Sequence, residues 1–331
     1  MIKWGIIGLG NMAHKFANAI KETNNSKLVG IASLDKKRLK SFKENFGISE
    51  ENIYYGYDNL INSKNIDSIY ISTLNNTHLE IIKKCAESKK NILCEKPFTL
   101  NNEEAKIAQD YIKKNDINFY EAIAYRTHDQ TKKIKKIIDQ NEVGNIISIE
   151  SSFGFKVKKI KHESRLFNKN LGGGSILDLG CYPLSFLSFL FNDKNEYKMS
   201  NVKGSFVSTG VDSYAEAEIK IKKNINCIIK VSIIENLQNK IIIKGSKGEL
   251  IVNNPWLPDK KSTLDIKTGN SFYKKFVNSE LTIYANQIQK ISENFEKKIK
   301  DDKFAVNIDD SLHIMKNLSL WSNLIKNNNH V

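Results

Sequence analysis

Short apolar runs alternate with amphipathic stretches along the first 124 residues of the chain. The apolar runs are typical of buried strands and occupy residues 2–7, 28–33, 66–72, 92–94 and 119–124. The stretches between them repeat apolar residues at helical spacing and occupy residues 11–20, 39–46, 79–88 and 103–114. Strands that alternate with helices predict right-handed crossovers and a doubly wound parallel sheet. We expect this α/β domain to end near residue 124.

The pattern changes beyond residue 124. A helical segment at 131–140 precedes runs in which apolar and polar residues alternate, at residues 146–155, 202–209, 213–222, 226–235, 239–244 and 249–252. This alternation predicts an antiparallel sheet with one open face. A glycine-opened helical segment at 172–191 lies between the first two runs, and a helix at 309–324 closes the chain. Residues 125–331 should therefore form an α+β domain with a large, mostly antiparallel sheet.

Composition limits the class of protein. A chain of 331 residues can bury two cores, and 40% apolar with 27% charged residues is not the composition of a disordered chain. No apolar run approaches the roughly 20 residues that span a bilayer, and the opening lacks a secretory pattern, so we expect a cytoplasmic protein with no membrane partner. The cysteines lack the spacing of disulfide frameworks or zinc sites; they are Cys85, Cys94, Cys181 and Cys227. We expect no metal.

The formal net charge of +14 makes nucleic acid a class of partner to consider. The lysine clusters around 132–136, 156–161 and 297–300 lack interleaved aromatic residues and match no docking motif, so a solvated surface is favoured over a nucleic-acid patch. Only three of the 51 basic residues are arginines, namely Arg38, Arg126 and Arg165. Because the guanidinium fork suits phosphate and carboxylate, each arginine is a weak candidate for binding.

A glycine motif follows the first predicted strand and opens the first helix: Gly8-Leu9-Gly10-Asn11-Met12-Ala13. This is the context that a dinucleotide-binding Rossmann motif requires. Gly8 permits the turn, Gly10 lets the backbone approach a pyrophosphate, and Ala13 lets the helix pack close to the strand. Asn11 and Met12 stand at the helix N-terminus, which supplies donors and a favourable dipole. The alternative is a tight turn without a ligand.

The end of the second strand indicates which dinucleotide binds. An acidic residue there binds the ribose hydroxyls of NAD, and a basic residue binds the 2′-phosphate of NADP. Ser33 occupies this position, Asp35 follows, and Lys36–Arg38 come next. A hydroxyl and a cation cluster favour NADP(H), with NAD(H) possible. In the alternative, Asp35 caps a helix whose first turn, Lys36–Arg38, is solvated.

Two further motifs contain candidate catalytic residues. Glu95-Lys96-Pro97 follows the fourth predicted strand at its carboxyl end, where open α/β sheets bind ligands. The run from Gly172 to Pro183 begins with three glycines and spaces Asp178 and Tyr182 four residues apart, on one face if it is helical. A phenol ionises near pH 10, and a neighbouring ammonium favours its phenolate, which suits acid/base catalysis.

At these residues the sequence resembles the Gfo/Idh/MocA oxidoreductase family over essentially the whole chain. The motifs that carry the resemblance are GLGNMA, Thr73-Leu74-Asn75-Asn76-Thr77-His78, Glu95-Lys96-Pro97, Glu121-Ala122 with Tyr125-Arg126, GGGSILDLGCY, Gly245-Ser246-Lys247-Gly248-Glu249 and Pro255-Trp256. The tyrosine at 182 looks like the glucose-fructose oxidoreductase and dihydrodiol or xylose dehydrogenase branch, which tends to use NADP.

The resemblance implies roles for individual residues. Lys96 is then the catalytic lysine, with a cis peptide before Pro97, while Asp178 and Tyr182 face the substrate. The remaining residues expected to bind the cofactor are Gly8, Gly10, Asn11, Met12, Ser33, Arg38, Thr73, Asn75, His78, Glu95 and Arg126. The sequence departs from the family at Leu74, usually Pro, and at Leu34, where NADP-using relatives often have Arg. The second departure weakens the NADP prediction unless Arg38 replaces that guanidinium.

Structural alternatives remain for these residues. Lys96 could be a surface ammonium paired with Glu95, Tyr182 a core aromatic residue, and His78 a helix cap. Arg165 lies in a polar loop before the glycines and could simply be solvated. No metal-ligand cluster accompanies His128.

We therefore expect a two-domain, NAD(P)-dependent dehydrogenase or reductase acting on CH–OH groups of a sugar, polyol or dihydrodiol-like small molecule. Tyr182 exchanges the proton of the substrate hydroxyl with the help of Lys96. Alternatively, Lys96 transfers this proton and Asp178 holds Lys96 in place. A second hypothesis is a catalytically silent regulator that responds to dinucleotide and sugar. The open sheet face predicts a homodimer or homotetramer formed through the C-terminal sheet.

Overall fold

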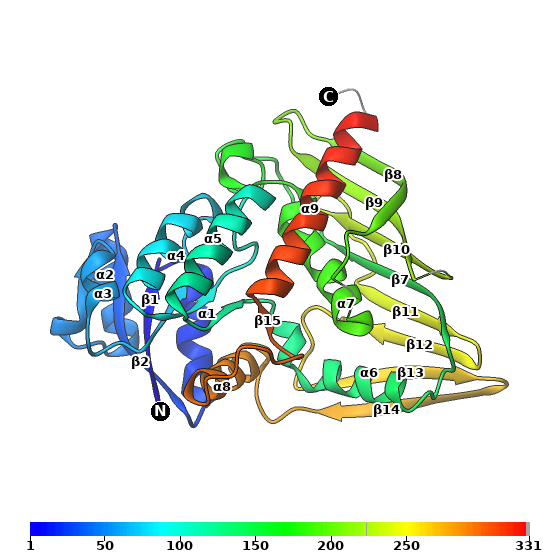
Figure 1. The fold of residues 1–331 in the computed structure, drawn as a ribbon, viewed down its shortest axis with the longest axis horizontal. Helices are drawn as coiled ribbons and strands as arrows, with labels where there is room; N and C mark the ends of the chain where they lie inside the picture. The colour runs from blue at the N-terminus through cyan, green and yellow to red at the C-terminus, as the bar shows by residue number, and fades with distance from the viewer. Residues whose placement is uncertain (193, 223, 329–331) are drawn as a thin grey trace. The chain divides into compact units, whose positions relative to one another are not determined.

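The chain folds into two units, shown in Figure 1 and described for residues 1–192, 194–222 and 224–328 of a computed structural model. The first unit combines Met1–Thr127 with Leu281–Leu312. The second combines His128–Glu280 with the chain from His313 onward. Each unit therefore consists of two separate segments of the chain. Our sequence-based division assigned residues 281–312 to the second domain, but in the structure this segment packs with the first unit.

The first unit is built on a seven-stranded sheet with the order β15-β6-β5-β4-β1-β2-β3. Its strands are β1 Ile2–Ile7, β2 Ser26–Ser33, β3 Ile53–Tyr55, β4 Ser68–Ile71, β5 Asn91–Cys94, β6 Phe119–Glu121 and β15 Val306–Asn307. All neighbouring pairs are parallel except β15 with β6. The predicted doubly wound parallel sheet is thus confirmed. The short edge strand β3 was not predicted.

Helices connect these strands: α1 Asn11–Ala19, α2 Lys36–Phe46, α3 Asp58–Asn62, α4 His78–Glu87 and α5 Asn102–Asn115. Strand β1 pairs with β2 on one side and with β4 on the other, so the strand order reverses at β1. Loops at the carboxyl ends of β1 and β4 diverge at such a reversal, which is where ligands of open α/β sheets bind. The loops after β1 and β4 therefore define the region of interest in the first unit.

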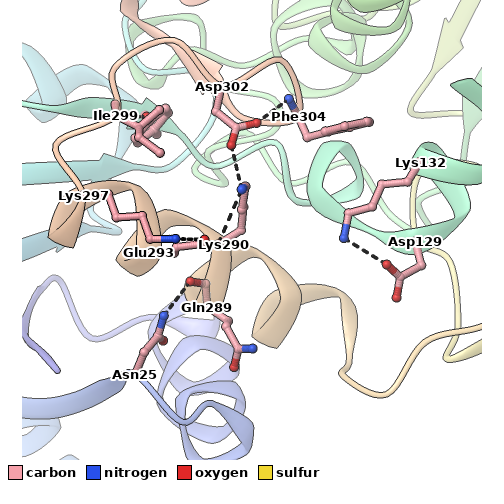
Figure 2. Close-up of polar contacts among 11 residues, drawn as sticks. Asn25, Asp129, Lys132, Gln289, Lys290, Glu293, Lys297, Ile299, Asp302 and Phe304 are labelled. Carbon is pink, nitrogen blue, oxygen red and sulfur yellow. Dashed lines mark hydrogen bonds and ion pairs between the residues drawn. The ribbon is translucent and has the colours of Figure 1, made fainter.

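The segment 281–312 completes the first unit through helix α8, Ile283–Glu296. The Trp4 indole donates a hydrogen bond of 3.0 Å to Ser292 Oγ, and the Trp4 and Phe295 ring centroids lie 5.6 Å apart. Figure 2 shows polar links of the same segment: Asn25 Nδ2 donates to the Gln289 carbonyl at 2.9 Å. Contacts between residues more than 250 positions apart explain why local patterns did not assign α8 to this unit.

Figure 2 also shows how the chain beyond α8 is fixed. Lys290 Nζ forms an ion pair of 2.8 Å with Asp302, whose other oxygen accepts a hydrogen bond from the Phe304 backbone N–H. Lys297 pairs with Glu293 one helical turn away, at 2.7 Å. These contacts position the turn that leads into β15, next to the β6 edge of the sheet.

The second unit contains an eight-stranded sheet with the order β14-β13-β12-β11-β7-β10-β9-β8. Its strands are β7 Ile146–Gly154, β8 Lys198–Phe206, β9 Asp212–Ile221, β10 Ile225–Ser232, β11 Lys240–Gly245, β12 Gly248–Asn253, β13 Lys261–Thr268 and β14 Ser271–Asn278. All pairs are antiparallel except β10 with β7. The predicted mostly antiparallel sheet is confirmed.

The hairpin β13–β14 was not predicted from the sequence. In β13 only Leu264 and Ile266 are fully buried, and in β14 adjacent lysines stand among exposed aromatic residues, so neither strand has a long apolar alternation. Strand β14 forms an edge of the sheet, where charged residues limit pairing with other chains. Helices α6 Asp129–Asp139, α7 Cys181–Phe191 and the later part of α9 Ile308–Asn328 belong to this unit.

One face of the large sheet is covered. A Cβ at Gly204 of β8 would lie 3.1 Å from Ile325 of α9, and a Cβ at Gly180, before α7, would lie 2.8 Å from Leu318 and 3.2 Å from Trp321 of α9. The stretch Lys169–Phe191 has the length and hydropathy of a membrane span, but 78% of its apolar window is buried inside the protein, as expected for a core helix. The core of this unit thus lies between α7, α9 and the sheet.

Candidate active site

The turn between β1 and α1 has the form that the glycine motif predicts. Gly8 has φ of +87°, and a Cβ at Gly8 would lie 2.7 Å from Thr73 Cγ2, so only glycine fits there. A Cβ at Gly10 would meet no atom within 4 Å. Helix α1 has no side-chain cap and no acidic residue in its first turn, where Asn11 is exposed and Met12 half-buried. Its N-terminal N–H groups are thus available to an anion.

The end of β2 contains both features that the sequence suggested. Asp35 is the N-cap of α2: its carboxylate accepts hydrogen bonds from the N–H groups of Lys37 at 2.8 Å and Arg38 at 3.1 Å. Ser33 is buried, and its hydroxyl accepts from the Asp35 N–H at 3.1 Å. The Arg38 side chain is 60% exposed, with Nε 3.5 Å from Asp35 Oδ2. The capping alternative is therefore observed, and the Arg38 guanidinium remains accessible to a ligand.

The segment after β4 contributes an unsatisfied donor. Thr77 donates a hydrogen bond of 2.7 Å to Thr73 Oγ1, which shapes the turn. Asn75 is 5% exposed, and within the described chain its buried Nδ2 has no hydrogen-bond partner. A buried amide without a partner is costly unless a ligand or water satisfies it. This donor and the open space at Gly10 fit a bound dinucleotide.

His78 links this segment to the Glu95-Lys96-Pro97 motif. The ring is fully buried, with Nε2 3.3 Å from the Thr73 carbonyl and Nδ1 3.2 Å from the Pro97 carbonyl. Burial lowers the pKa of His78 to about 4, so the ring is neutral at physiological pH. A neutral imidazole has a single N–H, so the ring donates to one of these two carbonyls at a time, and a direct cofactor contact remains a prediction.

The Glu95-Lys96-Pro97 motif follows β5, and its Lys96–Pro97 peptide is cis, as the resemblance implies. Glu95 is 9% exposed and accepts a hydrogen bond of 2.5 Å from the Tyr70 hydroxyl. Lys96 itself is only half-buried. The carboxylate of this motif is thus anchored in the core, while Lys96 stays partly exposed.

Glu121, at the end of β6, belongs to the Glu121-Ala122 motif, and the sequence analysis assigned no role to it. Its Oε1 accepts a hydrogen bond of 3.1 Å from the Phe98 N–H, directly after the motif. Burial raises the pKa of Glu121 to about 7, and Lys96 opposes this shift. A charged residue at the end of a buried strand is the sequence signal that could have identified it.

Arg126 is 2% exposed within the first unit. Its Nη2 donates a hydrogen bond of 2.6 Å to the Lys303 carbonyl, in the segment that follows α8. Burial lowers the pKa of Arg126 to about 10, which leaves the guanidinium charged at neutral pH. The structure therefore shows a fixed internal cation, and its expected cofactor contact stays a prediction.

In the second unit, Asp178 lies in a π-helical turn, Ile176–Gly180, directly before α7. Such turns are frequent at functional sites. Arg165 Nη1 lies 2.9 Å from Asp178 Oδ1, and the two side chains are 46% and 6% exposed. The alternative in which Arg165 is simply solvated is therefore excluded.

The glycine run explains how this pair is held. A Cβ at Gly173 would lie 2.8–2.9 Å from the carbonyl oxygens of Arg165, Leu166 and Asn168, so the run lets that loop pack against the π turn. Asp212, which the sequence analysis missed, accepts hydrogen bonds from Ser175 Oγ at 2.6 Å and the Ile176 N–H at 2.7 Å. Its carboxylate caps the turn that carries Asp178.

Tyr182 is half-buried against two aromatic residues. Its ring centroid lies 4.9 Å from that of Phe153 and 6.0 Å from that of Trp256. The Trp256 indole is itself fixed by a hydrogen bond of 2.8 Å to the Ser152 carbonyl. These contacts orient the ring without burying it completely, so both the core and the catalytic interpretations remain compatible with its position.

The structure thus gathers the predicted residues in two groups, one in each unit. Within residues 1–192, 194–222 and 224–328, no three His, Cys, Asp or Glu side chains form a candidate metal site. Comparison with known proteins matches family models in both parts of the chain. Residues 2–123 match the model of an oxidoreductase family with an NAD-binding Rossmann fold, and residues 131–251 match the GFO/IDH/MocA C-terminal domain.

The chain is also similar to curated proteins. Over 259 residues it is 29% identical to a trans-1,2-dihydrobenzene-1,2-diol dehydrogenase of Xenopus tropicalis, covering 77% of each chain. The corresponding dehydrogenase of Mus musculus is 28% identical over 259 residues, which are 78% of this chain and 76% of the mouse protein.

Two solved structures share the fold. Aldose-aldose oxidoreductase from Caulobacter crescentus, complexed with glycerol, has a TM-score of 0.90 at 19% identity, covering 99% of this chain and 98% of its own. A 3-ketoreductase from Actinomadura kijaniata, in complex with NADP and TDP-benzene, has a TM-score of 0.85 at 20% identity, covering 96% and 95%. With family models matched in both parts of the chain, the protein belongs to the Gfo/Idh/MocA family and is an NAD(P)-dependent oxidoreductase of the dehydrogenase/reductase type.

Proposed function

We propose that the protein transfers hydride between NADP(H) and the CH–OH or carbonyl carbon of a sugar, polyol or dihydrodiol-like small molecule. The observation that carries this proposal is the turn after β1, where Gly10 faces open space at the uncapped N-terminus of α1. A pyrophosphate can approach the backbone there and accept hydrogen bonds from its free N–H groups. The buried Asn75 amide offers a further donor.

The proposed cofactor residues divide into three groups by the part of the dinucleotide they bind. The phosphate turn consists of Gly8, Gly10, Asn11 and Met12, and the adenosine ribose with its 2′-phosphate is bound by Ser33 and Arg38. The nicotinamide side is lined by Thr73, Asn75, His78, Glu95, Lys96 and Arg126. NADP(H) is preferred because the exposed Arg38 guanidinium can pair with a phosphate. NAD(H) remains the alternative, since Asp35 contacts the same guanidinium.

When bound, the dinucleotide supplies or accepts the hydride. In the proposed reaction Tyr182 exchanges the hydroxyl proton of the substrate, and the Lys96 ammonium favours its phenolate form. Asp178 binds a substrate hydroxyl, oriented by Arg165 at 2.9 Å. The alternative assigns proton transfer to Lys96, with Asp178 as its partner.

The substrate class follows from family membership and from the names of relatives, which are a dihydrodiol dehydrogenase and an aldose oxidoreductase. Half-buried Tyr182 between Phe153 and Trp256 also offers an apolar wall for a ring. A catalytically silent, sugar-responsive regulator is the second candidate, but no observation on the chain favours it.

The proposed protein is cytoplasmic and forms a homodimer or homotetramer through the large sheet, without nucleic-acid or membrane partners. Its edge hairpin exposes Phe272 and Phe276, which are 56% and 73% accessible, and apolar surface of this kind is suited to a second copy. Light scattering at several protein concentrations measures the oligomeric state, and a monomer throughout would reject this part of the proposal.

A titration tests the cofactor assignment. Purified protein is titrated with NADPH and NADH by intrinsic fluorescence, alongside Arg38→Ala and, as a matched control, Lys40→Ala on the same helix. We expect Arg38→Ala to weaken NADPH binding on the order of tenfold and to leave NADH binding within about twofold. A carbohydrate and dihydrodiol panel with the bound cofactor then identifies the substrate. Binding without turnover of any compound would favour the regulator.

A further inference from the structure

Three buried polar side chains hold the chain around Lys96, and each comes from a different element. Tyr70 of β4 bonds to the Glu95 carboxylate, His78 of α4 contacts the Pro97 carbonyl, and Glu121 of β6 accepts from the Phe98 N–H. Tyr70 and His78 are neutral at physiological pH. Glu121 differs from them because it can carry a charge next to the ammonium of Lys96.

Glu121 is buried, and both favourable and unfavourable groups act on its carboxylate. The side chain is 2% exposed, and the Glu121 backbone pairs with Val306 of β15. The charged groups that act on Glu121 are Lys96 and Glu95 from the end of β5, and the titratable Cys94 thiol lies on the same strand. The Ser311 hydroxyl, at the start of α9, stabilises the carboxylate, although Oε2 has no hydrogen bond of normal geometry in the described chain.

These groups act in opposite directions. Burial and the like charge of Glu95 disfavour the carboxylate form of Glu121, while Lys96, Ser311 and the Phe98 N–H favour it. The result is a pKa of about 7, so Glu121 changes charge within the physiological range. Interaction between two titrating groups is reciprocal: if Lys96 favours ionised Glu121, ionised Glu121 favours the charged form of Lys96 by the same free energy.

We propose that Glu121 is a positioning residue for Lys96, which fixes the Lys96–Phe98 turn through the Phe98 N–H and stabilises the Lys96 ammonium by opposite charge. This inference rests on the proposed function only in that Lys96 takes part in the reaction. Glu121 is not a catalytic residue in this proposal, because its carboxylate is buried and acts through Lys96.

The geometric and electrostatic functions can be separated. In Glu121→Gln the amide oxygen still accepts the Phe98 N–H, but the negative charge is gone. We expect kcat to fall on the order of tenfold and the alkaline limb of its pH profile to move down by about one unit, because Lys96 then loses its proton more readily. The dissociation constant for NADPH should stay within about twofold. Glu121→Asp should restore part of the alkaline limb.

A matched control is available in the same region. Glu104 Oε2 accepts a hydrogen bond of 3.0 Å from the Leu100 N–H, two residues beyond Phe98. Glu104→Gln removes a carboxylate with the same kind of backbone contact and should leave the pH profile of kcat unchanged. An unchanged profile in Glu121→Gln as well would overturn the proposal.

A second measurement does not depend on turnover. Infrared difference spectra of the full-length protein follow protonation of the Glu121 carboxyl group across roughly pH 5–9, a range that brackets its titration. Subtracting the spectra of Glu121→Asp assigns the carboxyl band of Glu121. In Lys96→Met the pKa of Glu121 should rise by at least about half a unit, since the favourable ammonium is lost. No change in Lys96→Met rejects the coupling. A rise without any activity in the wild-type protein would support the coupling and reject the proposed function instead.

Discussion

Arg165 Nη1 lies 2.9 Å from Asp178 Oδ1, and the pair joins an exposed loop to a buried π turn. The loop backbone packs against Gly173, so the glycine run and the ion pair together fix the position of the Asp178 carboxylate. One of the three arginines in the chain therefore has a structural partner among the residues predicted to face the substrate.

Arg165→Ala should raise KM for the alcohol or carbonyl substrate on the order of tenfold, because the Asp178 carboxylate loses the cation that orients it. Steady-state kinetics with saturating cofactor provide the test, and NADPH binding should not change. Lys161→Ala removes an exposed cation from the same loop and serves as control. Equal effects of the two substitutions would show that loop charge matters, rather than the contact with Asp178.

Tyr182→Phe should lower turnover on the order of a hundredfold or more if the phenol carries the proton. The ring contacts with Phe153 and Trp256 are kept, so the thermal stability should change little. Tyr273→Phe removes a hydroxyl at the sheet edge, 3.4 Å from Glu142, and is the matched control. Turnover that survives in Tyr182→Phe assigns the proton transfer to Lys96.

The two glycines of the β1–α1 turn should respond differently to alanine. Gly8→Ala should lower the free energy of unfolding by roughly 1–3 kcal/mol, because φ is +87° and the Cβ would lie 2.7 Å from Thr73 Cγ2. Gly10→Ala should leave stability unchanged, since its Cβ meets no atom within 4 Å. It should weaken dinucleotide binding on the order of tenfold by narrowing the approach to the backbone.

Urea unfolding and fluorescence titration measure the two effects separately. A Gly10→Ala protein that binds NADPH as tightly as the wild type would argue against a pyrophosphate at this turn.

His78 and Glu121 should impose opposite pH dependences on stability. The pKa of His78 falls from 6.5 to about 4 on folding, so its contribution is complete above pH 6.5 and is lost as pH falls toward 4. The pKa of Glu121 rises from 4.5 to about 7, so its contribution is complete below pH 4.5 and is lost as pH rises toward 7. Between pH 4.5 and 6.5 the two partly cancel.

Single variants should reveal the cancellation. Relative to wild type, Glu121→Gln should add a positive slope to the free energy of unfolding of about 1.4 kcal/mol per pH unit, and His78→Gln a negative slope of similar size. Urea denaturation at half-unit intervals of pH measures both. Parallel curves for all three proteins would contradict the assigned protonation states.

Elements with a strong local pattern were predicted correctly. Strand β1, the glycine turn and α1 follow from apolar runs and from the conformational freedom of Gly8, which depend on neighbouring residues only. The helix α8 and the hairpin β13–β14 were missed. Helix α8 depends on contacts with distant Trp4 and Asn25, while β13 and β14 have few buried apolar residues and therefore no long alternation.

The sequence by itself determined the two-part architecture, the dinucleotide turn and the identity of Lys96, Asp178 and Tyr182 as candidates, because periodicity and glycine placement act over a few residues. Only the tertiary structure brought Arg165 to Asp178 and Glu121 to the Phe98 N–H, and returned residues 281–312 to the first unit. Those contacts join residues that are far apart in the chain. Their free energy depends on burial and on atomic distance, which exist only once the chain has folded.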